Sequence, residues 1–228
     1  MKITLTNAGK RFNREWIFRH LSYEFYGGQS YAIVGPNGSG KSTLLQLLAG
    51  ATSPSEGKLE YFHAQQSENK GLIPMVGDQP ALLSENIYKT LSFSAPYQEL
   101  IEEMTLTEFL DFHQVFKPFL AHYDTAGIVA VMGLQDAAHK QIRYFSSGMK
   151  QRVKLAQAIF SNTALLLLDE PCTNLDSEGV TLYQQLIADL SGSRLVIVSS
   201  NDLQEYSFCQ TRMDMRNYKQ GLTLTGNQ

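Results

Sequence analysis

The chain has 228 residues, of which 43% are hydrophobic, and its formal net charge at pH 7 is −3. This length suffices for one large α/β domain, or for a core with a subdomain. The small acidic charge argues against a strongly basic surface, so we expect no direct binding to nucleic acid. No apolar stretch approaches the roughly 18 residues that a membrane span needs, and residues 1–7 lack the apolar region of a signal peptide.

Strands and helices alternate along the first part of the chain. Apolar alternation and turn residues predict strands over residues 2–6, 21–26, 31–34 and 58–62. Residues 44–49 read as a helix that Gly50 ends. The polar, Gly- and Pro-containing residues 63–80 are interpreted as an irregular insertion.

The pattern becomes helical between about residues 101 and 160. Thr105 and Glu108 form a capping box, and helices are predicted over 123–132 and 149–160. The α/β alternation then resumes with a strand at 165–169, a helix at 178–190 and a strand at 194–199. Alternating strands and helices predict a largely parallel sheet, and the helical block that interrupts them predicts a second lobe.

An aromatic stripe follows the capping box at intervals of three and four residues: Phe109, Phe112, His113 and Phe116. Such spacing is typical of the buried face of a helix. We therefore expect these side chains to be core residues rather than a binding site.

One short segment carries the clearest chemistry: Gly35, Pro36, Asn37, Gly38, Ser39, Gly40, Lys41, Ser42 and Thr43. It matches G-x-x-x-x-G-K-[ST] and lies between an apolar strand and a helix. Glycines allow several backbone N–H groups to point at one anion, and the helix adds its positive end. We expect Lys41 to reach the β- and γ-phosphates of a nucleoside triphosphate and the Ser42 hydroxyl to bind Mg²⁺.

A second candidate lies 128 residues after Lys41, where four leucines end in Asp169 and Glu170. A buried parallel strand delivers its last residues to the sheet edge where ligands bind. We expect Asp169 to hold Mg²⁺ through water and Glu170 to polarise the attacking water.

Further motifs resemble the nucleotide-binding subunit of an ATP-binding-cassette (ABC) transporter. The run from Phe145 to Met149 resembles the family's Leu-Ser-Gly-Gly-Gln signature, and residues 173–176 resemble the loop that follows the catalytic acid. The resemblance covers essentially the whole chain. It implies one domain with a P-loop NTPase-type core, an antiparallel β part and an inserted helical subdomain. Residues 1–92 and 162–228 would form the core, and residues 93–161 the subdomain with the signature.

The resemblance also implies an activity and partners. The chain would bind ATP and Mg²⁺ and hydrolyse ATP in a head-to-tail dimer. Ser146, Ser147 and Gly148 would contact the ATP of the second subunit. The dimer would power an integral membrane permease from the cytoplasmic side, as a peripheral protein on the inner face of the membrane. A clamp or regulatory protein with little turnover is the alternative.

Three positions of the family pattern remain open from the sequence. Phe12 occupies the usual place of the aromatic residue that stacks on adenine, with Trp16 as a competitor. Asn201 stands where the family has a γ-phosphate-sensing histidine, and it lacks the proton that histidine can carry. For the glutamine between core and helical lobe, alignment points to Pro96 or Tyr97, so Gln98 is predicted to serve and Gln79 is the second candidate.

Overall fold

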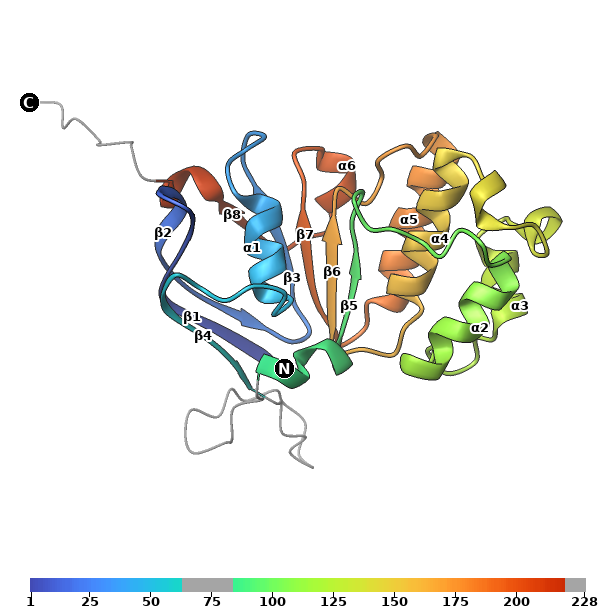
Figure 1. Cartoon of the computed structure of the whole chain (residues 1–228), viewed down its shortest axis with the longest axis horizontal. Helices are drawn as coiled ribbons and strands as arrows, with labels where there is room; N and C mark the ends of the chain where they lie inside the picture. The colour runs from blue at the N-terminus through green and yellow to red at the C-terminus, as the bar shows by residue number, and fades with distance from the viewer. Residues whose placement is uncertain (63–83, 220–228) are drawn as a thin grey trace, which may run out of the picture.

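Two β-sheets and a group of helices make up residues 1–62 and 84–219, the parts of the chain that the computed structural model describes (Figure 1). The predicted insertion at 63–80, with Gln79, lies outside the described residues. The central sheet is parallel, in the order β5-β6-β7-β3-β8. Its strands are β3 Ser30–Val34, β5 Leu91–Ser94, β6 Leu165–Asp169, β7 Leu195–Ser199 and β8 Thr211–Asp214.

The central strands are buried on both faces, which explains their continuous apolar sequences. Leu166 and Leu168 of β6 pack into one core cluster with α4 (Ser147–Ile159) and α5 (Ser177–Leu190). Leu165 and Leu167 face the other way, into a cluster with α1 (Lys41–Leu48) and the second sheet. All four leucines are fully buried.

The second sheet is antiparallel, in the order β2-β1-β4, with β1 Lys2–Phe12, β2 Glu15–Tyr26 and β4 Glu56–Phe62. Strands β1 and β2 are about twice as long as predicted from the sequence. The alternation breaks at Asn7, but the pairing continues through bulges, with positive φ angles of 47° at Asn7 and 57° at His20. The two predicted strands are thus parts of one long hairpin.

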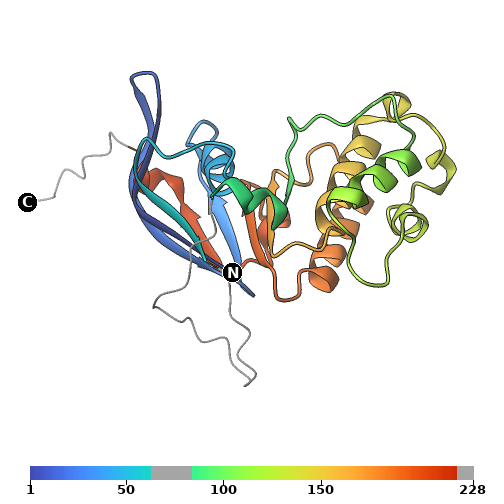
Figure 2. The same cartoon turned by 60° about the horizontal axis from the view of Figure 1, so that its bottom comes forward.

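Helices α2 and α3 lie at the opposite end of the molecule from the antiparallel sheet (Figure 2). Helix α2 (Leu106–Phe116) begins at the predicted Thr105–Glu108 capping box, and α3 (Thr125–Val131) ends before Gly133, whose φ is 67°. The other helical elements are α6 Leu203–Tyr206 and four 3₁₀ turns at Ser84–Lys89, Gln135–Ala137, Ile142–Tyr144 and Met215–Tyr218. The expected fold class, a largely parallel α/β core with an antiparallel part and inserted helices, is confirmed.

The aromatic stripe of α2 does not form one buried face, and the prediction was wrong for two of its members. Phe109 is 5% exposed, but Phe112 is 43% and Phe116 is 68% exposed. The neighbouring Val115 is 76% exposed. Only the side of α2 that carries Phe109 is covered by the helical core, because no other element packs on its outer side in the described residues.

The parallel arrangement determines where a ligand site can form. All five strands run in the same direction, so their carboxyl ends lie along one edge of the sheet. From that edge, β3 enters the Gly35–Gly40 loop, β6 ends in Asp169, and β7 leads to Asn201. Strand β5, which was not predicted, leads from the same edge into the helical part.

Candidate nucleotide-binding site

The loop between β3 and α1 has a backbone that only glycine tolerates at two points. Gly35 has a φ of 143°, and a Cβ there would lie 2.8 Å from Ser39 Oγ. Gly40 has a φ of 97°, and a Cβ there would lie 2.6 Å from Ile17 Cγ2. The sequence motif therefore corresponds to a tight loop pressed against β2 and closed over its own serine.

Helix α1 begins differently from the other α-helices in the described ranges. Its N-cap is Gly40, and no side chain accepts from its first N–H groups. The other five helices each have a side-chain cap, from Thr105, Asp124, Ser146, Asp176 and Asp202. The N–H groups of residues 41–43 have no partner within the helix either, so the amino end of α1 is suited to an anion.

Lys41 places its ammonium group inside this loop. Its side chain is 5% exposed, and Nζ donates to the carbonyl oxygens of Gly35 at 2.8 Å and Pro36 at 3.5 Å. A buried cation next to unpaired N–H groups makes the loop strongly attractive to phosphate.

Asp169 and Glu170 lie at the carboxyl end of β6, as predicted. Asp169 is 2% exposed and pairs in register with Ser199 of β7. Glu170 donates its N–H to the Ser199 carbonyl at 2.9 Å and has a φ of 43°. Since β7 alone separates β6 from β3, about 10 Å lies between the end of β6 and the end of β3.

Unpaired polar atoms gather at this edge. Seven buried side-chain polar atoms lack a hydrogen-bond partner in the described residues, and five of them lie at the strand ends or the loops that follow: Ser39 Oγ, Ser94 Oγ, Gln98 Oε1, Asp169 Oδ1 and Ser199 Oγ. Buried polar atoms need partners, so the edge is suited to a polar ligand with its water. No group of three metal-binding side chains occurs in the described ranges. Mg²⁺ bound to nucleotide needs only one or two carboxylates, so the edge fits Mg²⁺ and a triphosphate.

Asn201 directly contacts the segment Gly35–Thr43, called the phosphate loop below. Its Oδ1 accepts from the Gly35 N–H at 3.3 Å, and its Nδ2 donates to Asn37 Oδ1 at 3.1 Å. The structure thus brings together the three segments that the sequence marked, Gly35–Thr43, Asp169–Glu170 and Asn201.

The two candidate adenine-stacking residues lie in the β1–β2 hairpin. Phe12 is 49% exposed, with Lys10 Nζ 5.2 Å from its ring centroid. The Trp16 ring has the guanidinium groups of Arg11 at 5.4 Å and Arg19 at 4.2 Å. Trp16 is therefore flanked by protein cations, whereas Phe12 retains about half of its surface.

The segment after β5 presents Tyr97 toward the site. The raised pKa of the Tyr97 hydroxyl is due first to burial, and also to its proximity to Asp169, whereas a hydrogen bond to Gln46 acts in the opposite direction. Gln46 is a single polar residue in the apolar run of α1, and no role was predicted for it from the sequence. Gln98 donates its N–H to the Ala95 carbonyl at 3.1 Å, and its Oε1 is one of the unpaired atoms described above.

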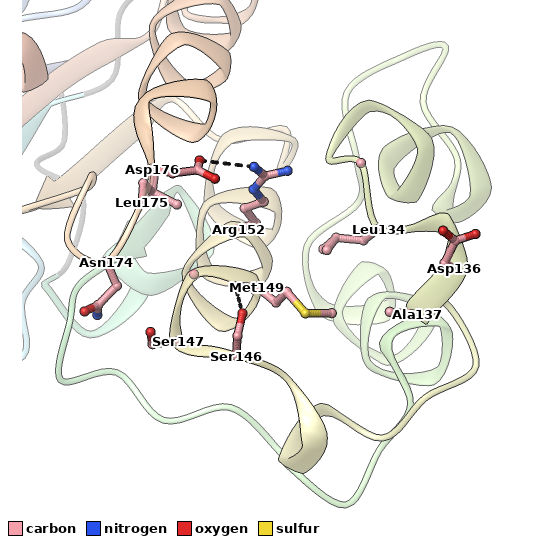
Figure 3. A pocket seen from close by; sticks show the side chains of 12 residues that line it. Leu134, Asp136, Ala137, Ser146, Ser147, Met149, Arg152, Asn174, Leu175 and Asp176 are labelled. Carbon is pink, nitrogen blue, oxygen red and sulfur yellow. Dashed lines mark hydrogen bonds and ion pairs between the residues drawn. The ribbon is translucent and has the colours of Figure 1, made fainter.

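The signature segment forms a separate site at the start of α4. Ser146 caps the helix by accepting the Met149 N–H at 3.2 Å, and a Cβ at Gly148 would lie 3.0 Å from the Asn174 carbonyl oxygen. This helix end borders a pocket of about 510 Å³ between α4, residues 174–176 and the loop after α3 (Figure 3). No residue of the phosphate loop lines it. Ser146, Ser147 and Gly148 are thus not part of the site around Lys41 of the same chain.

Comparison with known proteins agrees with this geometry. The sequence profile of the ABC transporter family matches residues 18–173. A dimeric structure of the ATP-binding cassette MJ0796, in a post-hydrolysis state with ADP and Pi, superposes with a TM-score of 0.73 at 23% identity and covers 93% of each chain. At that identity the superposition shows the shared fold. No helix in the described residues is long and apolar enough to cross a membrane.

Curated relatives extend the match over nearly the full chain. The uncharacterised ABC transporter ATP-binding protein YybJ of Bacillus subtilis is 28% identical, covering 93% of this chain and 92% of its own. The tungstate uptake system ATP-binding protein TupC of Peptoclostridium acidaminophilum is also 28% identical and covers 89% of each chain. The chain therefore belongs to the ABC transporter family, as a nucleotide-binding domain of that family.

Proposed function

We propose that the chain is an ATPase subunit that binds ATP with Mg²⁺, dimerises head to tail on the nucleotide and drives a separate membrane permease. The supporting observation is that an uncapped helix end, a buried lysine and a buried carboxylate with an unpaired oxygen meet at one sheet edge. A metal-bound triphosphate needs this combination. In this proposal residues 1–92 and 162–228 act as the core of one cassette and residues 93–161 as its helical subdomain.

Several residues bind the substrate in this proposal. Lys41 and backbone N–H groups of the Gly35–Thr43 loop hold the β- and γ-phosphates. Phe12 stacks on adenine, because about half of its surface is exposed, whereas two arginines flank the Trp16 ring. Ser42 and Asp169 hold Mg²⁺, which when bound withdraws charge from the phosphates.

Three further side chains act at the γ-phosphate end of the site. Glu170 accepts a hydrogen bond from the water and aligns it with the γ-phosphate. Asn201 donates its amide to the γ-phosphate, and Gln98 completes the site from the segment after β5. Each of these residues follows the carboxyl end of a strand and acts through a hydrogen bond. None of these roles requires a histidine proton at position 201.

The dimer closes the second half of the site. Ser146, Ser147 and Gly148 of one subunit bind the ATP held by the other subunit's phosphate loop. This arrangement is supported by the position of Ser146–Gly148, which border a pocket that no phosphate-loop residue of the same chain lines. The amino end of α4 can attract an anion, but no equivalent of Lys41 lines the pocket beside it. A nucleotide held by Lys41 of a second subunit would account for this site.

The permease binds the outer face of α2 in this proposal. Phe112 and Phe116 lie with ring centroids 5.1 Å apart, and together with Val115 they expose apolar surface. Contiguous exposed apolar side chains mark interaction surfaces. The similarity to the ATP-binding protein of a tungstate uptake system supports a transport role. The subunit would then be cytoplasmic and peripheral on the inner face of the membrane.

A clamp or regulatory role with little turnover is the second candidate. The observation in its favour is the asparagine at position 201, whose amide is engaged by Gly35 and Asn37. A steady-state turnover rate near the typical enzyme value of about 10 per second would exclude it.

Steady-state ATP hydrolysis by Glu170→Gln tests the central role. We expect turnover to fall about 100-fold or more, with the dissociation constant for ATP unchanged and an ATP-dependent dimer that persists. Glu178→Gln, an exposed carboxylate in the first turn of α5, is the matched control. Wild-type turnover in Glu170→Gln contradicts the role proposed for Glu170.

Purification of the complex from its native membrane tests the permease. Phe116→Ser should lose the co-purifying membrane subunit while ATP binding remains. Val131→Ser, at a partly exposed apolar position of α3, controls for the loss of an apolar side chain. Recovery of soluble partners alone from the wild-type chain contradicts the transport proposal.

A further inference from the structure

Glu205 is a buried carboxylate that has no part in the chemistry proposed above. It lies in α6 and is 5% exposed. Burial raises the pKa of Glu205, as do the nearby carboxylates of Asp202 and Glu170, whereas hydrogen bonds from Ser200 and Cys172 lower it. The carboxylate is thus placed between the segment that carries Asn201 and the segment that follows Glu170.

Its contacts connect these two segments. Glu205 Oε1 accepts the N–H of Cys172 at 2.7 Å. On its own side, the Glu205 N–H donates to the Asp202 carbonyl at 3.1 Å, and the Glu205 carbonyl accepts the Tyr183 hydroxyl at 2.8 Å. The backbone of Glu205 is therefore held by Tyr183 of α5 and by Asp202, while its side-chain oxygen reaches across to the backbone at Cys172.

The segment it reaches is the turn that contains Glu170. The Thr173 N–H donates to the Glu170 carbonyl at 3.1 Å and closes a turn whose two central residues are Pro171 and Cys172. Glu170 has a φ of 43°, a left-handed conformation that a residue with a side chain rarely adopts. Such a conformation persists only where surrounding bonds hold it. The bond from Cys172 to Glu205 is a side-chain tether of that turn.

We propose that Glu205 is a positioning residue that aims the Glu170 carboxylate by holding the Cys172 N–H. The inference rests on the proposed function, in which Glu170 orients the attacking water. The turn needs an oxygen that accepts the Cys172 N–H at the distance that the Glu205 side chain spans. It does not need the negative charge of Glu205. The same carboxylate fixes the distance between the loop of Asn201 and the loop of Glu170, because α6 begins two residues after Asn201.

Three substitutions at Glu205 separate the effect of side-chain length from the effect of charge. Glu205→Gln keeps the length and an acceptor oxygen but removes the charge. Glu205→Asp keeps the charge but is shorter by one methylene, and Glu205→Ala removes both. We expect Glu205→Gln to retain kcat within about threefold, and the Asp and Ala variants to lose about 10- to 100-fold, the range that small misplacement of a reacting group produces. KM for ATP should stay within about twofold in all three, because the phosphate loop is not touched.

Tyr183→Phe provides the matched structural control, since it removes the hydroxyl that donates to the Glu205 backbone carbonyl and leaves the bond between Glu205 and Cys172. It should lower Tm and leave kcat within about twofold. The exchange rate of the Cys172 amide proton gives a readout that does not depend on turnover. Exchange should accelerate in Glu205→Asp and Glu205→Ala and remain slow in Glu205→Gln.

The outcomes distinguish this inference from the proposed function. Wild-type kcat in Glu205→Asp beside an inactive Glu170→Gln overturns the positioning role alone. Loss of kcat in a folded Glu205→Gln, with retention in Glu205→Asp, shows that charge matters and also overturns it. Wild-type kcat in Glu170→Gln overturns the role of Glu170 and, with it, this inference.

Discussion

The side-chain amide of Asn201 donates a hydrogen bond to the side-chain oxygen of Asn37 across 3.1 Å. The two residues are 164 positions apart, and the bond joins the loop after β7 to the phosphate loop. The Asn201 oxygen also accepts the Gly35 N–H at 3.3 Å. Asn201 therefore supports the shape of the phosphate loop, in addition to any contact with the γ-phosphate.

Asn201→Ala is expected to weaken ATP binding as well as turnover. The variant removes both hydrogen bonds to the loop, and a net loss of about 1 kcal/mol should raise the dissociation constant for ATP about fivefold. Titration calorimetry with ATP measures it, and Asn162→Ala, an exposed asparagine after α4, is the control. An unchanged dissociation constant would mean that Asn201 does not support the loop.

Tyr97 is expected to influence the requirement for Mg²⁺, because its hydroxyl lies near Asp169 and Gln46. Tyr97→Phe removes the hydroxyl but keeps the ring, whose centroid is 6.3 Å from that of Phe93. The Mg²⁺ concentration for half-maximal turnover should rise about fivefold, the effect of one hydrogen bond of about 1 kcal/mol. Binding of ATP without Mg²⁺ should not change.

The exposed Tyr88 provides the control for that experiment. Tyr88→Phe removes the same hydroxyl from a tyrosine of the 3₁₀ turn before β5. Equal Mg²⁺ dependence in Tyr97→Phe and the wild-type chain would exclude a contribution of Tyr97 to the metal site.

Strands and loops formed by consecutive residues were predictable from the sequence, whereas contacts between residues far apart in the chain were not. Residues 165–169 form a strand with the predicted bounds, because a strand buried on both faces must be apolar throughout. The phosphate loop was predictable because its chemistry lies in consecutive backbone groups. Strand β5 was missed because Leu-Ser-Phe-Ser is short and half polar; its Ser92 is buried against Thr163 and Arg194.

The exposure of the α2 aromatics and the role proposed for Glu205 also depend on contacts between residues that are far apart in the chain. Helical spacing identifies residues that share a face, but the tertiary neighbours decide whether that face is covered. Phe112 and Phe116 remain exposed because α3 and α4 pack on the side of Phe109. The bond between Cys172 and Glu205 spans 33 residues, and nothing in either local sequence indicates it.

Gly148 is expected to control the ATP-dependent dimer. A Cβ there would lie 3.0 Å from the Asn174 carbonyl, so Gly148→Ala should push the start of α4 away from that turn. In a Glu170→Gln background, ATP should then no longer produce a dimer in light scattering. The dissociation constant of the monomer for ATP should stay the same, because the phosphate loop does not line the pocket at Gly148.

The control for this prediction is a glycine with the same degree of crowding. Gly127 lies in the first turn of α3, and a Cβ there would lie 3.0 Å from Asp124 Oδ1. Gly127→Ala should leave the ATP-dependent dimer intact. A dimer that forms equally well in Gly148→Ala would contradict a role of the signature segment in dimerisation.

His113 is expected to make the stability of the fold depend on pH. Its ring lies between those of Phe109 and Phe119, with centroid distances of 6.5 and 6.1 Å. Burial, and then the charge of Lys117, lowers the pKa of His113 to about 4, from an ordinary value of 6.5. Between these two pH values the unfolded chain binds more protons than the folded chain, so protonation favours unfolding.

The free energy of unfolding should therefore fall as the pH decreases from 6.5 to 4, and His113→Gln should reduce that slope. Urea unfolding at a series of pH values measures it, with His139→Gln as a control at an exposed histidine. Because carboxylates protonate at the lower end of the same window, the decisive quantity is the difference in slope between His113→Gln and His139→Gln. Equal slopes in the two variants would show that His113 is not buried as a neutral side chain in the folded protein.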